Sequence, residues 1–262
     1  MTARTLESAP AHLPSVSQAT RDKLLLVAGL LLAWQLLSLV TGPEVLTTPL
    51  ATVRKLAQMV ASPDFAGHAI ETGSAFAVAL VISLAGGLGL GVMLGAHRLS
   101  GEVAEPLLVG LYSIPKITLY PVVLLLFGLG MSAKIAFGAM HGIIPVVLFT
   151  MTAVRSIPQV YIRAAHSMRL TPLQMFGRVL VPASLPEIVT GFRFGFSLTL
   201  LGTLIGEMFA SQRGIGYLLV KAMENNNTDV ILALALLLVL LATAASWLLL
   251  AIERRVHGRF AG

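Results

Sequence analysis

The chain contains no cysteine and few charged residues. The missing cysteine excludes disulfide bonds, thiolate metal sites and cysteine nucleophiles. Only 11% of the 262 residues are charged, whereas soluble domains carry about 25%. A water-soluble surface needs more charge than this, and 56% of the residues are hydrophobic. The composition therefore predicts a protein that crosses a membrane several times.

The formal net charge of +6 has two interpretations. A basic chain can bind nucleic acid, as many basic domains do. In a chain this apolar, however, the excess of Lys and Arg is better explained by loops that face an anionic membrane leaflet. We therefore expect membrane lipid, and no nucleic acid, among the partners.

Several stretches are long enough to cross the bilayer as helices, which takes about 20 mostly apolar residues. The expected spans are 24–40, 70–94, 107–127, 135–154, 188–209 and 230–252. The third is interrupted by Pro115 and Pro121, which remove backbone donors. The expected fold is an all-α, polytopic membrane bundle of about six transmembrane helices.

This fold divides the chain into a transmembrane domain over 24–252 and two short cytoplasmic tails, 1–23 and 253–262. A cleaved signal peptide is the alternative for the first span. It is disfavoured because the apolar run is long and no A-x-A-like site follows Val40.

Lys and Arg are distributed unevenly between the loops. With both termini in the cytoplasm, the inner segments contain eleven of these residues and the outer segments only five, namely Arg54, Lys55, Lys134, Arg213 and Lys221. Positive residues accumulate on the cytoplasmic side of membrane proteins. We therefore expect both termini to be cytoplasmic.

Glycines recur at a spacing of four residues within several spans. Small residues at this spacing let two helix backbones approach closely. The spacing predicts a compact bundle with helix–helix interfaces on most spans. The sets are Gly87, Gly91 and Gly95; Gly138 and Gly142; Gly191 and Gly195; Gly202 and Gly206.

One long cytoplasmic loop, 155–187, is expected to form a helical hairpin. Pro158 suits the first turn of a helix that runs to about Leu170. Thr171 then caps a second, short helix whose first residue is Pro172.

Pro182 and Pro186 are expected to end the second helix before the next span. Leu173 and Phe176, with Val179 or Leu180, would share one face of it. Two interpretations of the hairpin stay open. It can dock a cytoplasmic partner, or it can be a connector that lies at the level of the lipid headgroups.

The same loop contains a specific pattern, which reads Arg163-Ala164-Ala165, then Arg169, then Val179 and Val181-Pro182. It resembles the cytoplasmic EAA loop of permease subunits in bacterial ATP-binding-cassette (ABC) importers. That loop reads E-A-A, three residues, G, nine residues and I-x-L-P. The two alanines, the final proline and the spacing match, whereas Arg163 and Arg169 replace the family's Glu and Gly.

Further fragments extend the resemblance over about 150 residues and specify the nitrate/sulfonate/taurine branch of these permeases. Their order and separation, more than any single fragment, carry the resemblance. The fragments are Ser113-Ile114-Pro115-Lys116, Phe127-Gly128-Leu129-Gly130, Lys134-Ile135, Gly206-Glu207-Met208 and Gly214-Ile215-Gly216-Tyr217.

The resemblance implies a type I importer permease in the bacterial inner membrane. Two copies would form the pore, two separate ATPase subunits would hold the two loops, and an extracytoplasmic binding protein would deliver the solute. The implied coupling residues are Arg163, Ala164, Ala165, Met168, Arg169, Leu170, Thr171, Pro172, Leu173, Phe176 and Pro182.

Two departures from the pattern affect this coupling loop. Arg163 reverses the charge of the family's Glu, and Arg169 requires a turn that tolerates a side chain. We expect a matched ATPase with compensating acidic residues.

The chain lacks the G-x-x-x-x-G-K-[ST] loop that binds nucleotide phosphates. ATP and Mg²⁺ would therefore be bound by the partner subunits. The sequence assembles no nucleophile–base pair and no metal-ligand spacing, so we expect neither catalysis nor a cofactor in this chain.

Ionisable residues at membrane depth are candidates for the translocation pathway. Lys116 could meet a small anion there, or its ammonium could extend to the interface from a span that begins later. Glu207 is a second candidate, although capping of the turn before Gly214 or a pair with Arg213 is preferred to solute contact.

Two further polar residues are expected to be structural. Arg193 is expected to pair with Glu187, and His141 to be packed and hydrogen-bonded rather than a ligand. Outside the spans, residues 51–60 form an amphipathic helix that would lie along the outer membrane surface.

The alternative function is a secondary transporter driven by an ion gradient. Such a protein is expected to show buried carboxylates for ion coupling and often inverted repeats. Glu207 gives little support to a secondary transporter, and the helical hairpin of the loop 155–187 would then be unexplained.

Overall fold

The computed structural model describes residues 18–260, with the side chains of 19, 20, 172, 173, 176, 210 and 256–260 left aside. Residues 1–17 of the predicted cytoplasmic tail and 261–262 thus lie outside the described residues. The described part is helical. In chain order its elements are α1 (Gln18–Thr41), α2 (Pro49–Val60), α3 (Pro63–Ala96), α4 (Arg98–Ser113), a 3-10 turn (Lys116–Leu119), α5 (Tyr120–Phe127), α6 (Met131–Arg155), α7 (Gln159–Ser167), α8 (Pro172–Met175), a π turn (Phe176–Leu180), α9 (Val181–Ala210), α10 (Ile215–Glu224) and α11 (Thr228–Phe260).

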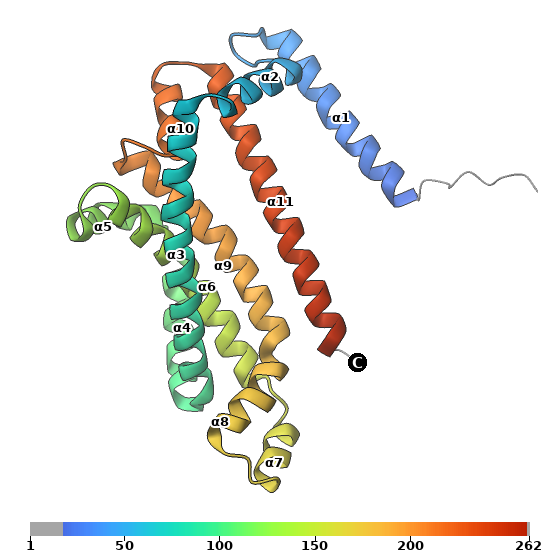
Figure 1. The fold of residues 1–262 in the computed structure, drawn as a ribbon, viewed down its shortest axis with the longest axis vertical. Helices are drawn as coiled ribbons and strands as arrows, with labels where there is room; N and C mark the ends of the chain where they lie inside the picture. Colours follow the sequence, from blue (N-terminus) through green and yellow to red (C-terminus); the bar gives the residue numbers. More distant parts are fainter. Residues whose placement is uncertain (1–17, 261–262) are drawn as a thin grey trace, which may run out of the picture.

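Five helical stretches are long and apolar enough to cross a membrane, and they confirm five of the predicted spans: Arg21–Thr41, Pro63–Ala96, Met131–Arg155, Gly177–Phe209 and Thr228–Arg255. Several of these helices extend beyond the predicted ends. The predicted all-α membrane bundle is therefore the observed architecture (Figure 1).

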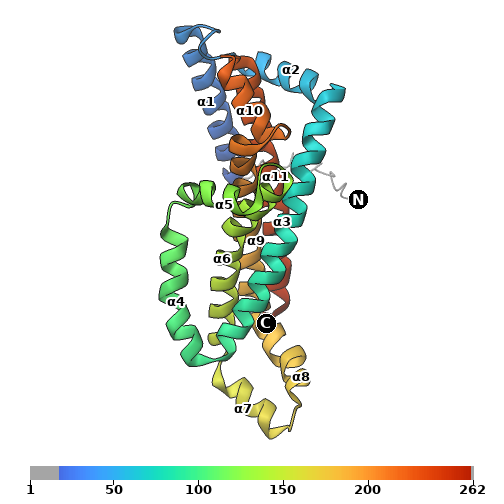
Figure 2. The same ribbon diagram turned by 90° about the vertical axis from the view of Figure 1, so that its left-hand side faces the viewer.

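The third predicted span, 107–127, is not one straight helix. It is divided between α4 and α5, which are bent by 88° at the break between them. Ile114, the residue before Pro115, is extended at φ −66° and ψ 133° because a following proline disfavours helical backbone. The two helices therefore form an elbow, which Figure 2 shows at one side of the bundle.

α6 is the central helix and packs between α3 and α9. The glycines of α3 face it, and a Cβ at Gly87, Gly91 or Gly95 would lie only 2.5 to 2.8 Å from a side chain of α6. On the other side, Gly138 and Gly142 of α6 face side chains of α9. The predicted close helix–helix interfaces are confirmed.

Two prolines of the loop 155–187 correct the sequence prediction. Pro182 and Pro186 do not end a helix before the next span, because both lie within α9. Pro182 is the second residue of α9 and lies within the continuous helical stretch Gly177–Phe209. The π turn just before it, Phe176–Leu180, takes up the irregularity.

The bundle has two distinct ends. α7 and α8 project from one end, while α2 and α10 lie at the other (Figures 1 and 2). α2 begins after Thr48, whose hydroxyl accepts a hydrogen bond from the Ala51 N–H. The predicted amphipathic helix 51–60 is thus part of α2, which crosses the end of the bundle formed by α3, α10 and α11.

Candidate functional site

The turn after α7 closes the first half of the hairpin. The Leu170 N–H donates to the Ala165 carbonyl at 3.1 Å, and the Arg169 N–H donates to the His166 carbonyl at 2.9 Å. These are the two bonds of a Schellman motif, whose pivot residue is usually glycine. Arg169 occupies the pivot with φ +50°. The position where the family pattern has glycine is thus one that requires left-handed backbone.

The second half of the hairpin begins with a capping box. The Gln174 N–H donates to the Thr171 hydroxyl at 3.3 Å, and the Thr171 N–H donates to the Gln174 side-chain oxygen at 3.0 Å. The predicted cap at Thr171 is therefore present, with Pro172 as the first residue of α8. The side chains of Pro172, Leu173 and Phe176 lie outside the described residues, so the predicted apolar face of α8 is not placed.

α7 and its C-cap residue Met168 present an apolar stripe to solvent on one side. Val160, Tyr161 and Met168 are 64%, 52% and 63% exposed, and Ala164 lies among them. Ala165 is fully buried and faces the rest of the molecule. The opposite flank is polar. Its exposed residues are Gln159, Arg163, His166 and Ser167.

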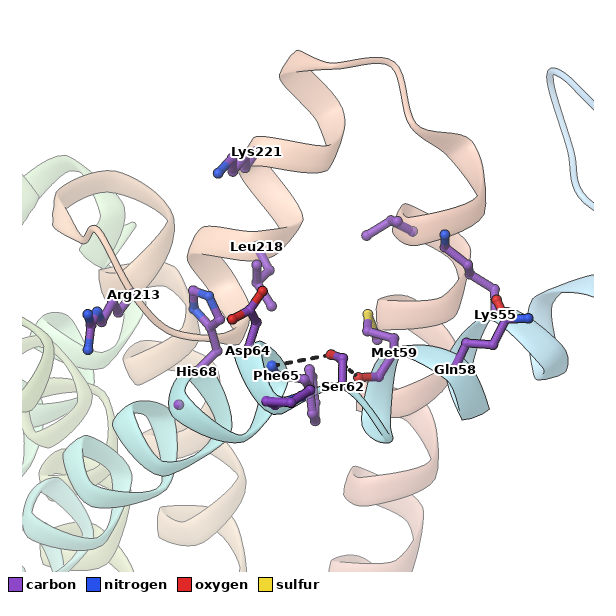
Figure 3. Close-up of a pocket in the computed structure, with 13 residues that line it drawn as sticks. Lys55, Gln58, Met59, Ser62, Asp64, Phe65, His68, Arg213, Leu218 and Lys221 are labelled. Atoms are coloured by element: carbon purple, nitrogen blue, oxygen red, sulfur yellow. Dashed lines mark hydrogen bonds between the residues drawn. The ribbon is translucent and has the colours of Figure 1, made fainter.

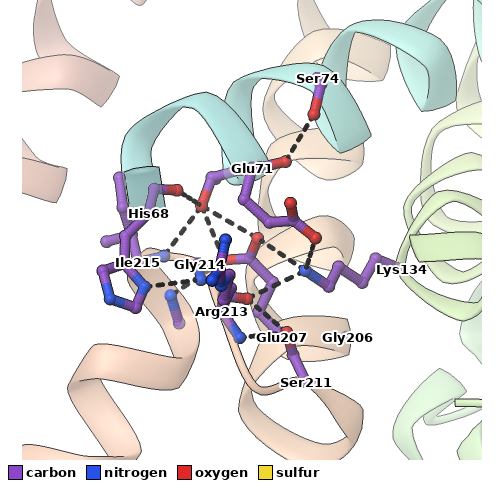
Figure 4. A network of polar contacts seen from close by, with 12 residues as sticks. His68, Glu71, Ser74, Lys134, Gly206, Glu207, Ser211, Arg213, Gly214 and Ile215 are labelled. Atoms are coloured by element: carbon purple, nitrogen blue, oxygen red, sulfur yellow. Dashed lines mark hydrogen bonds and ion pairs between the residues drawn. The ribbon is translucent and has the colours of Figure 1, made fainter. Parts of the chain in front are cut away.

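A buried polar network lies at the other end of the bundle (Figure 4). Lys134, in the first turn of α6, is 1% exposed. Its Nζ lies 3.0 Å from a carboxylate oxygen of Glu71 on α3 and 3.8 Å from one of Glu207 on α9. It also donates to the Arg213 carbonyl at 2.9 Å. One cation thus joins three helices and the turn after α9.

The same network fixes the turn between α9 and α10 through its backbone. The Gly214 N–H donates to His68 Nδ1 at 3.0 Å, and the Ile215 N–H donates to the Thr72 hydroxyl at 2.8 Å. The Gly216 N–H donates to Glu207 at 3.0 Å. Buried backbone donors need such partners, so side chains of α3 and α9 satisfy the free N–H groups at the start of α10.

Glu207 is fully buried within this network. Besides the Gly216 bond, its carboxylate accepts the Thr72 hydroxyl at 2.9 Å. The preferred prediction that it caps the turn near Gly214 agrees with this geometry. Gly214 has φ +122°, and a Cβ there would collide with the Glu207 carboxylate. Glycine is therefore required at this contact.

Sequence patterns do not reveal this structural role of Lys134, which enters them only as an outer-loop cation and as part of the fragment Lys134-Ile135. One signal was available, since Lys134, Glu71 and Glu207 each lie near the outer end of a predicted span. Charges at one membrane depth are expected to pair. The predicted topology, and not the spacing along the sequence, indicates that these three residues lie at the same membrane depth.

Lys116 lies at the elbow between α4 and α5 and is half-buried. Its ammonium donates to the Tyr112 carbonyl at 3.1 Å and lies 4.8 Å from the centre of the Tyr112 ring. The structure does not bring Lys116 to the Lys134 network. The two predicted pathway candidates, Lys116 and Glu207, are thus in separate surroundings.

The two residues expected to be structural are only partly as predicted. Arg193 pairs with Glu253 of α11, at 3.1 Å, and not with Glu187, because a residue on α11 lies beside it at this level of the bundle. His141 is buried, and its Nδ1 lies 2.9 Å from the Phe137 carbonyl, as expected for a packed histidine.

Comparison with known proteins relates this architecture to solute import. Residues 87–258 match the family of binding-protein-dependent transport system inner membrane components. A putative aliphatic sulfonates transport permease of Bacillus subtilis is 28% identical over 80% of this chain and 77% of its own. The taurine transport system permease of Escherichia coli is 29% identical over 69% and 67% of the two chains.

A nitrate import permease of Leptolyngbya laminosa is 28% identical over 77% of this chain and 75% of its own. Among solved structures, the inward-facing methionine ABC transporter MetNI contains a chain of the same fold. Its TM-score is 0.59 at 24% identity, covering 71% of this chain and 93% of that one. The chain therefore belongs to the inner membrane components of binding-protein-dependent transport systems, in which its relatives are permeases of the sulfonate, taurine and nitrate type.

Proposed function

We propose that this chain forms the translocation pathway of an ATP-driven importer for a small anionic solute. Two copies would form the pore, a binding protein would deliver the solute, and two ATPase subunits would dock on the loop 155–187. The relatives named for sulfonates, taurine and nitrate support an anionic solute. The chain has no phosphate-binding loop of the G-x-x-x-x-G-K-[ST] kind, which supports ATP hydrolysis by another polypeptide.

The orientation in the membrane follows from the distribution of charge. Arg98, Arg155, Arg163 and Arg169 belong to the end of the bundle that carries the hairpin, and α11 runs toward that end (Figure 1). We assign it to the cytoplasm, because positive residues accumulate there. The Lys134 network and α2 then lie on the extracytoplasmic side.

The proposal that an ATPase subunit docks on this loop is supported mainly by the apolar stripe on α7. In an isolated chain the apolar surface of Val160, Tyr161 and Met168 is in contact with water, which is unfavourable in free energy. A partner that covers this surface would remove that unfavourable term. The Schellman turn and the capping box hold the hairpin in one geometry, which lowers the entropy lost on docking. Ala165 is fully buried and α7 packs against the π turn that leads into α9, so movement of a docked partner would be transmitted to α9 through that turn.

Lys116 stays our candidate for contact with the anion, since it is the cation at the elbow between α4 and α5. Glu207 would act on the pathway only through the turn that it caps. Replacement of Lys116 by Met is expected to raise the solute concentration needed for half-maximal transport. An unchanged half-saturating concentration would remove Lys116 from the pathway.

The docking proposal is tested with two variants of α7 in proteoliposomes that contain the permease and its ATPase. Met168→Asp places a charge in the apolar stripe, while His166→Asp places the same charge near the same helix end on the polar flank. Both side chains are exposed, so both variants are expected to fold.

Burying an unpaired carboxylate in an interface is costly, so Met168→Asp should reduce binding-protein-stimulated ATP hydrolysis by about tenfold or more. His166→Asp should change it by less than about twofold. Equal rates in the two variants would show that the stripe is not the docking surface.

A further inference from the structure

A cleft opens at the end of the bundle that carries α2 and α10 (Figure 3). Its volume is about 650 Å³, and its walls come from α2, the first turns of α3, the turn after α9 and α10. The Ser62 hydroxyl accepts the Phe65 N–H at 3.4 Å and so fixes the start of α3 at its floor. The cleft is separate from the hairpin, which lies at the opposite end.

The cleft is lined by more positive than negative side chains. Its cations are Lys55 on α2, Arg213 in the turn and Lys221 on α10, and its carboxylate is Asp64. Within residues 18–260 none of the three cations makes an ion pair, although the Lys221 ammonium lies 5.8 Å from the Tyr217 ring centre. The cleft therefore has positive charge that the described chain leaves uncompensated.

The positions of the cations indicate the size of the ligand. In Figure 3, Lys55 lies at one side of the cleft, and Arg213 and Lys221 lie at the other. A site for a small anion needs polar groups that converge on one point. These three come from three different elements and do not converge. The arrangement suits acidic side chains spread over the surface of a protein.

The wall that carries Arg213 is rigid. Lys134 donates to the Arg213 carbonyl, and the Gly214 N–H donates to His68. Both polar groups of the peptide bond between Arg213 and Gly214 are therefore held by side chains of the bundle. A surface that is already ordered loses little entropy when a partner docks. The buried network thus prepares the cleft for recognition instead of leaving Arg213 on a loose loop.

From this charge, spacing and rigidity we infer that the cleft docks an acidic segment of the extracytoplasmic binding protein. The inference rests on the proposed function, which places this end of the bundle outside the cell. Lys55, Arg213 and Lys221 would each meet a carboxylate, and Asp64 would exclude acidic groups from the centre of the cleft. Charges at the rim of an interface mainly govern the association rate and its salt dependence.

The test uses the permease–ATPase complex in proteoliposomes and the purified binding protein that stimulates it. The readout is the binding-protein concentration that gives half-maximal ATP hydrolysis. Lys55→Gln, Arg213→Gln and Lys221→Gln should each raise it by about two- to fivefold, and the triple variant by about tenfold or more. The difference from wild type should shrink as salt is added.

Arg54→Gln is the matched control, because Arg54 is the exposed neighbour of Lys55 on α2 and does not line the cleft. It should leave the half-saturating concentration unchanged. If wild type is stimulated and the cleft variants keep the wild-type value, the docking inference is wrong while the proposed function stands. If no binding protein stimulates wild type, both fall. Monodisperse elution of each purified variant checks its folding.

Discussion

Removal of the Lys134 ammonium is the perturbation that the structure makes most consequential. Lys134→Met keeps a side chain of similar length but leaves Glu207, which is fully buried, without its cation. It also removes the hydrogen bonds to Glu71 and to the Arg213 carbonyl. Breaking a buried ion pair by deleting one partner costs about 3–5 kcal/mol. We expect this loss in the free energy of unfolding.

The assay is the apparent unfolding temperature of the purified permease in detergent. A loss of this size should lower that temperature by roughly 10 °C in a chain of this length. Lys116→Met is the matched control, because Lys116 is half-buried at the elbow and its ammonium contacts the carbonyl and ring of Tyr112, one helical turn away, and no carboxylate in the described residues. Its unfolding temperature should stay within about 2 °C of wild type.

A double-mutant cycle identifies the cause of the loss. Glu207→Gln removes the buried anion and retains one oxygen that can accept the Thr72 or Gly216 donor, so it should cost only about 1–2 kcal/mol. Adding it to Lys134→Met should recover part of the loss, because the two residues interact. Equal unfolding temperatures for wild type and Lys134→Met would show that the Lys134 ammonium does not stabilise the fold. Strictly additive effects would show that Lys134 and Glu207 are not coupled.

Two further predictions concern backbone conformation and helix packing. Arg169→Gly should relieve the cost of φ +50°, about 1 kcal/mol, and slow amide exchange at Leu170 about fivefold; faster exchange would contradict the Schellman geometry. Gly91→Ala should lower the unfolding temperature by the equivalent of about 1–3 kcal/mol, because its Cβ would lie 2.5 Å from Thr150 Cβ. Gly89→Ala, which meets nothing within 4 Å, should not, and a similar loss in both would argue against close α3–α6 packing.

The membrane spans could be predicted because their signal is local. Each long apolar run had to be a helix, since lipid offers the backbone no hydrogen-bond partners. The elbow between α4 and α5 shows the limit of that signal. Pro115 predicts an interruption of the third span, but the size of the bend, 88°, depends on how α5 packs against α6. Such packing involves residues that are distant in the sequence.

The hairpin and the polar network also differ in how far apart in the sequence their contacting residues are. Thr171 and Arg169 act on backbone groups a few residues away, so the cap and the special turn were foreseeable. The Lys134 network joins Glu71 to Lys134 and Lys134 to Arg213, and these pairs are 63 and 79 residues apart. Lys134 looked like a loop residue because its partners are identified only by the fold.

We propose that this chain conducts an anionic solute when a separate ATPase hydrolyses ATP. The most direct test of this proposal is uptake of taurine, an alkanesulfonate and nitrate into proteoliposomes that contain the permease and its ATPase. We predict uptake of one of these solutes, each of which carries a sulfonate or nitrate group, only when the binding protein is outside and ATP is inside the vesicles. Uptake by the permease alone, driven by a proton or sodium gradient and independent of ATP, would contradict the ATP-driven mechanism and indicate a secondary transporter.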